Sequence, residues 1–113
     1  MSIHNETLKN YDFLRVMYGD GYFPSFLVDR IKEILVHLCE EIEKKNPQST
    51  EALLILTHSA TKKINALEEE FEENDCELET EARESIGADF EFIVRCYGFA
   101  EIDIEDVIEP REW

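Results

Sequence analysis

Two histidines and the carboxylates near them are the residues of this chain whose types and spacing could do chemistry. Imidazole is the usual general base near neutral pH and a frequent metal ligand. His58 shares a polar line with Thr61 and Asn65, and Asp89, from a later helix, is placed to meet it. Such a pair is the orienting half of an acid–base site, but the sequence places no nucleophile beside it. A hydrogen-bonded network at a helix interface is the simpler interpretation, because buried polar groups need partners whether or not they catalyse a reaction.

The second histidine, His37, follows Glu33 by four residues, and Glu40 and Glu41 lie a turn further on. One helix face could therefore present three ligands to a divalent ion. The spacing is common by chance, and it differs from the Glu-x-x-His arrangement of di-metal bundles. A solvated pair on an exposed helix face is the better interpretation. We accordingly predict no metal, no cofactor and no catalytic residue.

An acidic stretch in the second half of the chain is the strongest candidate for a functional surface. Ten of the 17 residues from Glu68 to Glu84 are Asp or Glu, and only Arg83 is basic. Phe71 and Leu78 lie within this stretch, which we call the acidic ridge, at a spacing that would keep it attached to a core. A solvated helix end and loop that supply solubility are the alternative. The predicted binding residues of the ridge are Glu69, Glu70, Glu72, Glu73 and Asp75.

Aromatic residues provide a second predicted surface. Tyr18, Tyr22, Phe23 and Phe26 cluster around one turn, and the last residue is Trp113. Aromatic side chains flanked by carboxylates are typical of a patch that recognises a basic protein, so Trp113 is also a predicted binding residue. The alternative is that these side chains fasten the short terminal segments onto the core, above all at Phe23 and Phe26.

The net charge of −16 is carried almost entirely by the second half of the chain. Residues 1–66 hold 8 basic and 9 acidic residues, whereas residues 67–113 hold 3 and 18. A one-sided field can be aimed at a cationic partner. Because phosphate binding depends on Lys and Arg displacing counterions, and because anionic membranes repel an acidic surface, we predict neither a nucleic-acid nor a membrane ligand.

The cysteines and the amino-terminal stretch indicate the compartment. Cys39, Cys76 and Cys96 are odd in number and far apart, so they form neither a disulfide framework nor a CxxC pair, which suits a reducing cytoplasm. The first ten residues lack the pattern of a secretory signal, and no apolar run approaches the roughly 20 residues of a membrane-spanning helix. We therefore expect a soluble, cytoplasmic protein.

The elements that must position these residues are helices, because apolar residues recur at steps of three and four. Gly19 and Gly98 are expected to end helices in the left-handed conformation, and Asn46 with Pro47 to begin one. With 113 residues, the chain is expected to form a single domain over 1–113. We predict an all-α bundle of three main amphipathic helices with short helices at both ends. The predicted helices cover residues 8–18, 24–45, 47–71, 80–97 and 103–108.

Eight short stretches, spread over almost the whole chain, carry a resemblance to known proteins. They are Asn10–Leu14, Tyr22–Pro24, Leu27–Asp29, Leu56–His58, Ile64–Asn65, Phe71–Asn74, Gly87–Phe90 and Pro110–Trp113. Together they resemble a family of small, acidic bacterial proteins catalogued as a domain of unknown function. The resemblance implies a bacterial, cytoplasmic origin, and it brings no activity, cofactor or catalytic residue.

We expect a non-enzymatic binding protein whose acidic ridge engages a basic protein partner, in the manner of an immunity protein that neutralises a cationic toxin. The alternative is a small helical enzyme or divalent-cation-binding protein that uses the line of His58 and Asp89 as a cleft. A homodimer is a further alternative, because the four consecutive apolar residues Leu53–Leu56 cover more than one helix face.

Overall fold

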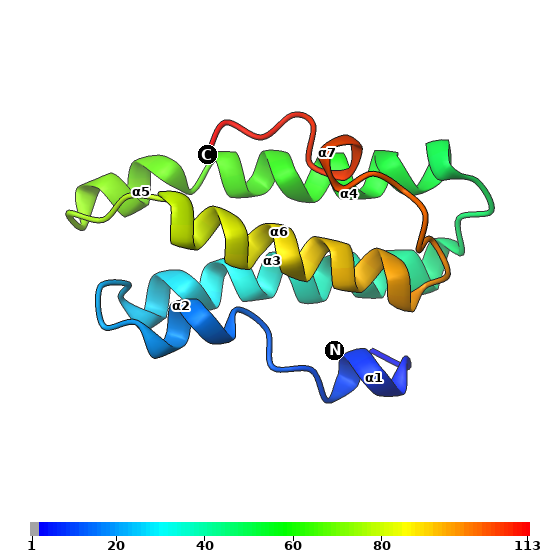
Figure 1. The fold of residues 1–113 in the computed structure, drawn as a ribbon, viewed down its shortest axis with the longest axis horizontal. Coiled ribbons are helices and arrows are strands. Elements are labelled where there is room, and N and C mark those ends of the chain that lie inside the picture. The colour runs from blue at the N-terminus through cyan, green and yellow to red at the C-terminus, as the bar shows by residue number, and fades with distance from the viewer. Residues whose placement is uncertain (1–2) are drawn as a thin grey trace.

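The computed structural model describes residues 3–113, and its regular elements are helices packed side by side (Figure 1). This confirms the all-α prediction. Met1 and Ser2, which belong to the predicted domain range and to the stretch inspected for a signal, lie outside the described residues. None of the helices in residues 3–113 is long and apolar enough to cross a membrane. The helices are α1 (Glu6–Lys9), α2 (Arg15–Gly19), α3 (Ser25–Lys45), α4 (Thr50–Asn65), α5 (Glu68–Glu73), α6 (Thr80–Cys96) and α7 (Ile104–Val107).

The long helices α3, α4 and α6 form the bundle, with α1 and α2 along one side of it and α7 across α4 on the other (Figure 1). Each long helix buries the apolar stripe that its sequence predicts, since burying one side of an amphipathic helix removes apolar surface from water. In α6, for example, Ala82, Ile86, Phe90 and Ile93 are completely buried. Gly98 follows this helix with a φ of +92°, as predicted for a terminating glycine.

The prediction of one helix over residues 8–18 is wrong. The chain instead forms α1 and α2 with a non-helical segment between them, and Leu14, just before α2, has a left-handed φ of +55°. The reason is a distant partner, because a carboxylate of α6 accepts the backbone N–H of Leu14 and so stabilises a conformation that a β-carbon disfavours. Gly19 remains helical, and Asp20 caps α2.

The third predicted helix, over residues 47–71, is in fact two helices. Asn46 does not begin it but ends α3, with a left-handed φ of +46°, and Ser49 caps α4 by accepting the N–H of Ala52 at 3.1 Å. The chain breaks again after Asn65, where the C-terminal segment is attached, and α5 then begins at Glu68. The acidic ridge therefore includes a helix of its own at one end of the bundle (Figure 1).

Candidate functional site

The polar line predicted on α4 attaches the C-terminal segment of the chain. His58 Nε2 lies 2.7 Å from the carbonyl oxygen of Asp106. The Asn65 side chain makes two bonds, donating to the carbonyl of Pro110 at 2.9 Å and accepting the N–H of Glu112 at 2.9 Å. These bonds satisfy backbone groups of a segment that has little regular structure, so they fasten that segment across α4.

The structure does not bring Asp89 to His58, which corrects the predicted pair. Asp89 is 4% exposed, and its two oxygens accept the Tyr11 hydroxyl at 2.6 Å and the Leu14 N–H at 2.7 Å. Burial raises the pKa of Asp89 and outweighs these two hydrogen bonds, which lower it. Thr61, the other predicted member, is buried and donates to a backbone carbonyl of its own helix. His58 and Asp89 face different terminal segments, so they do not form an acid–base pair.

A second carboxylate, Glu43 of α3, holds the amino-terminal segment in the same manner. It accepts the backbone N–H groups of His4 at 2.8 Å and Asn5 at 3.0 Å, and the Tyr97 hydroxyl at 2.5 Å. Burial would raise the pKa of Glu43, but these hydrogen bonds lower it below its ordinary value. Burial and the bond to Glu43 raise the pKa of Tyr97. The two carboxylate–tyrosine pairs are therefore structural attachments.

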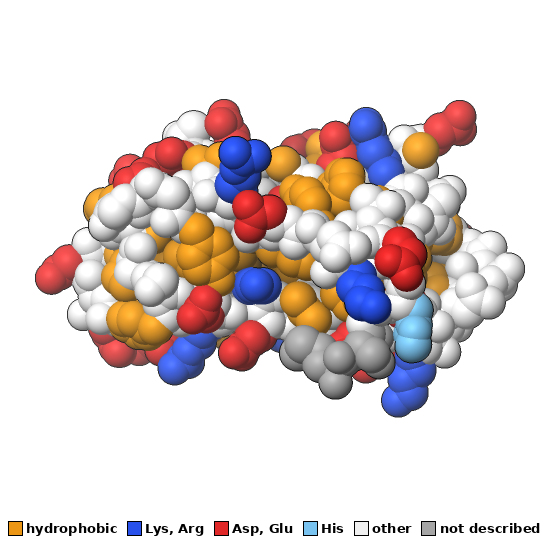
Figure 2. Space-filling view, turned by 90° about the horizontal axis from the view of Figure 1, so that it is seen from below, with side chains coloured by type: hydrophobic (Ala, Val, Ile, Leu, Met, Phe, Trp, Pro, Cys, Tyr) orange, Lys and Arg blue, Asp and Glu red, His pale blue; other side chains and the backbone are white. Residues whose placement is uncertain are grey.

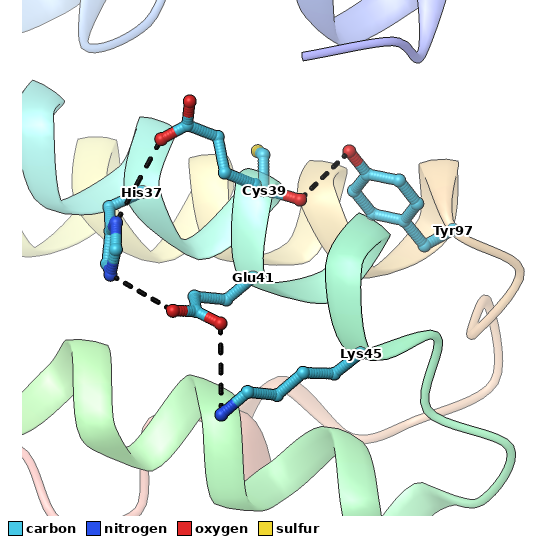
Figure 3. A network of polar contacts seen from close by, with 6 residues as sticks. His37, Cys39, Glu41, Lys45 and Tyr97 are labelled. Atoms are coloured by element: carbon cyan, nitrogen blue, oxygen red, sulfur yellow. Dashed lines mark hydrogen bonds and ion pairs between the residues drawn. The ribbon is translucent and has the colours of Figure 1, made fainter. Parts of the chain in front are cut away.

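The predicted His37 cluster lies on the side of α3 that faces α4 (Figure 3). His37 is 3.4 Å from Glu41 and 3.9 Å from Glu40, and Lys45 lies 3.8 Å from the other oxygen of Glu41. On the far side of α3, the Tyr97 hydroxyl donates to the carbonyl of Cys39 at 3.4 Å. Among residues 3–113, no group of three or more His, Cys, Asp or Glu side chains could hold a metal ion. The cluster is a network of charges between α3 and α4, in which His37 and Lys45 are exposed and Glu41 is half-buried with one oxygen out of contact with solvent.

The acidic ridge is held on the core at three points. Phe71, Cys76 and Leu78 are buried, as the spacing of Phe71 and Leu78 predicts. The charge of Glu70 is already paired within the protein, because Glu70 forms an ion pair with Arg30 of α3 at 2.9 Å. The other predicted binding residues of the ridge are exposed: Glu69, Glu72, Glu73 and Asp75.

Carboxylates from other parts of the chain join the ridge at this end of the bundle. The hydroxyl of Tyr22 accepts the N–H of Glu77 at 3.0 Å, which fastens the turn before α3 to the ridge. In this turn lies Asp20, whose hydrogen bond and charge raise the pKa of Glu81. A hydrogen bond with Glu79, together with its charge, raises the pKa of Glu77. Carboxyl groups that shift one another's pKa in this way lie close together, so negative charge is concentrated in a small area.

Trp113, one of the predicted binding residues, is buried at this end of the molecule. It is 5% exposed, and the guanidinium of Arg111 lies 5.7 Å from its ring centroid. With the ridge and Glu112 it lines a hollow of 230 Å³. Burial, then the charges of Glu112 and Glu72, raise the pKa of Glu68 beside it. The acidic lining residues of the hollow are Glu68, Glu72, Glu77, Glu79 and Glu112.

Exposed apolar side chains adjoin the acidic end, and we call Val16, Tyr18, Tyr22 and Phe26 the aromatic patch. Phe26 and Tyr22 are 52% and 50% exposed, whereas Phe23 is buried. Figure 2 shows apolar side chains at this end of the face that carries α1 and α2, with acidic side chains around them. The expectation that Phe26 packs inward is wrong. The helical periodicity could have predicted its exposure, because Phe26 lies just outside the buried stripe that begins at Leu27. Val16 had no distinguishing signal.

The fold and this surface define a small all-α protein with one strongly acidic end that bears exposed aromatic residues. The chain belongs to a family of unknown function, DUF5713, which it matches over residues 7–113. This confirms the family resemblance drawn from the sequence. No curated protein and no solved structure matches the chain.

Proposed function

We propose that this protein binds a basic protein partner through its acidic end. The observation that supports this most strongly is the convergence of carboxylates from three separate segments at one end of the bundle. Asp20 precedes α3, the ridge spans α5 and the start of α6, and Glu112 comes from the C-terminal segment. Tyr22 contacts the ridge directly and is half exposed. Solubility alone does not require acidic groups to crowd together, since a dispersed charge serves it equally well.

The two parts of this surface would contribute differently to binding. Long-range attraction by the acidic ridge raises the rate of encounter with a cationic protein and makes that rate sensitive to salt. The aromatic patch supplies short-range packing, since aromatic side chains dominate the energetics of many interfaces. The same division of roles would serve an immunity-like protein in a bacterial cytoplasm, the origin and location that we propose.

Charge-neutralising variants test the role of the ridge. The ridge variant leaves Glu70 intact, because Glu70 is already paired with Arg30, and it carries Glu69→Gln, Glu72→Gln and Glu73→Gln. A control variant removes the same number of exposed carboxylates elsewhere, by Glu51→Gln, Glu101→Gln and Glu109→Gln. Partners are captured from a bacterial lysate at low and high salt, and association is then measured with the purified partner. We expect the ridge variant to associate at least about tenfold more slowly at low salt, with a flatter salt dependence, than the control variant. Equal rates for the two variants would contradict the proposal.

A second pair of variants tests the aromatic patch. Phe26→Ser removes an exposed aromatic side chain of the patch, and Ile55→Ser removes an exposed apolar side chain of α4 that is 71% exposed. We expect Phe26→Ser to accelerate dissociation by about tenfold or more, while Ile55→Ser leaves it unchanged. Because Ile55 lies in the segment predicted to support a homodimer, sedimentation of Ile55→Ser also tests that prediction. Equal dissociation rates would exclude the patch from the interface.

A further inference from the structure

A hollow of 480 Å³ lies between the amino-terminal segment and α3, and it differs chemically from the rest of this acidic protein. Its volume falls within the range of about 300–1,000 Å³ that is usual for small-molecule sites. One wall is formed by the segment that holds α1 and the residues after it, and the other by α3. The lining residues are Ile3, His4, Leu8, Lys9, Tyr11, Phe13, Lys32 and Val36.

The charged groups of this hollow have one sign. Asp and Glu make up 27 of the 113 residues of the chain, yet none lines the hollow, whose charged side chains are Lys9 and Lys32. Neither lysine forms an ion pair with any other residue in the described part of the chain. Lys9 comes from the end of α1 and Lys32 from α3, so the fold brings together two cationic groups that are 23 positions apart in the sequence. Figure 2 shows basic and apolar side chains near one another on this face.

The remainder of the lining is apolar and held in place by packing. Leu8, Phe13 and Val36 belong to the buried core and form the floor of the hollow, with exposed fractions of 0%, 4% and 8%. Tyr11 is stacked on Phe92, with ring centroids 4.3 Å apart, and its edge-to-face contact with Phe13 has a centroid separation of 5.0 Å. Its hydroxyl is fixed on a buried carboxylate. A wall of this kind is formed before a ligand arrives, which lowers the entropy cost of binding.

We propose that this hollow binds a small amphipathic carboxylate, meaning a carboxylate group attached to an aliphatic chain or an apolar ring. The carboxylate lies between Lys9 and Lys32, and the apolar body packs against the half-buried Ile3 and Tyr11, over the floor formed by Phe13 and Val36. The two lysines select against cations. A polyanion is also disfavoured, because it carries more charges than the two lysines can pair and would place some of them against the apolar floor. The proposal does not depend on the basic protein partner, because the acidic ridge and the hollow share no residue.

Calorimetric titration of the full chain with decanoate tests the site. Decyltrimethylammonium has the same tail with the opposite charge, and decan-1-ol has the tail without a charge. We expect saturable binding of one decanoate per chain with a Kd below about 1 mM, at least about tenfold tighter than either control ligand. Absence of saturable binding, or equal affinity for decyltrimethylammonium, would overturn the proposal.

Two lysine variants locate the binding. Lys9→Gln and Lys32→Gln are each expected to weaken decanoate binding by roughly three- to tenfold, because each removes a charge-assisted contact at a partly exposed position. Lys44→Gln and Lys62→Gln remove exposed lysines elsewhere and serve as matched controls. Circular dichroism checks that all four variants fold. Unchanged affinity in the double variant Lys9→Gln/Lys32→Gln would overturn the site. The ridge variant should still bind decanoate, so a failure of this proposed site can be distinguished from a failure of the proposed function.

Discussion

Replacing Asp89 by Asn should destabilise the protein through the attachment of its amino-terminal segment. The Asp89 carboxylate accepts the Tyr11 hydroxyl at 2.6 Å and the Leu14 N–H at 2.7 Å in a site where it is almost fully buried. An Asn side chain offers one acceptor oxygen, and its amide group donates. One of the two donors therefore faces another donor in the variant.

The magnitude follows from the number of donors left without an acceptor. A buried donor without a partner costs about 1–3 kcal/mol, so Asp89→Asn should lower the free energy of unfolding by about that amount. Asp89→Ala strands both donors and should cost about 2–6 kcal/mol. The larger loss is a substantial part of the roughly 5–15 kcal/mol by which domains are usually stable.

The chain contains a matched control for this substitution. Asp29 accepts the Tyr18 hydroxyl at 2.5 Å, but this pair lies at the surface. Because water can replace the lost bond there, Asp29→Asn should cost less than about 1 kcal/mol. Urea unfolding followed by circular dichroism measures both variants. A double-mutant cycle with Tyr11→Phe should show coupling at Asp89, since each single change removes the same bond.

The pH dependence gives the same prediction a second readout. Burial raises the pKa of Asp89 in the folded state, so ionisation of this group opposes folding. Its stabilising contribution is complete below the unfolded pKa of about 3.9 and is lost as the pH rises through the folded pKa. The stability difference between the unmodified protein and Asp89→Asn should therefore widen as the pH falls through the folded pKa toward the unfolded one. Equal losses at Asp89 and Asp29, with no coupling to Tyr11, would refute the reasoning.

Two further predictions concern the other attachments of the terminal segments. Glu43→Gln leaves one acceptor oxygen for the three donors from His4, Asn5 and Tyr97. Hydrogen exchange of the backbone amides in α1 should therefore accelerate, and the free energy of unfolding should fall by about 1–3 kcal/mol. Unchanged exchange in α1 would contradict this. Trp113→Ala empties a buried position and should cost about 3–5 kcal/mol in thermal unfolding, whereas a loss below about 1 kcal/mol would show that the indole does not contribute as a core residue.

The long helices could be predicted from the sequence because their cause is local. An apolar stripe at steps of three and four residues specifies a buried face wherever the partner lies, and α3 and α6 have that pattern throughout. Local signals also located some helix ends. Gly98 has the left-handed conformation expected of it, and Asp103 caps α7 by accepting the N–H of Glu105.

The break between α1 and α2 and the break between α4 and α5 could not be predicted, because they depend on distant partners. The left-handed backbone of Leu14 is stabilised by a carboxylate 75 positions away, and no residue near Leu14 indicates it. The same holds for Asn65, whose bonds to the C-terminal segment mark the break between α4 and α5. Polar residues on helix faces were correctly expected to take part in networks, but side-chain types alone do not specify which partners they meet.

The division of charge along the sequence differs from the division of charge on the folded surface. In the sequence it separates a nearly neutral first half from an acidic second half, yet Asp20 of the first half joins the acidic end because Tyr22 fastens its turn to the ridge. Two lysines of the first half, Lys9 and Lys32, lie instead beside a hollow that no acidic residue lines. A protein of net charge −16 thus presents two surfaces of opposite character, so its total charge alone would exclude the anionic ligand that its local structure favours.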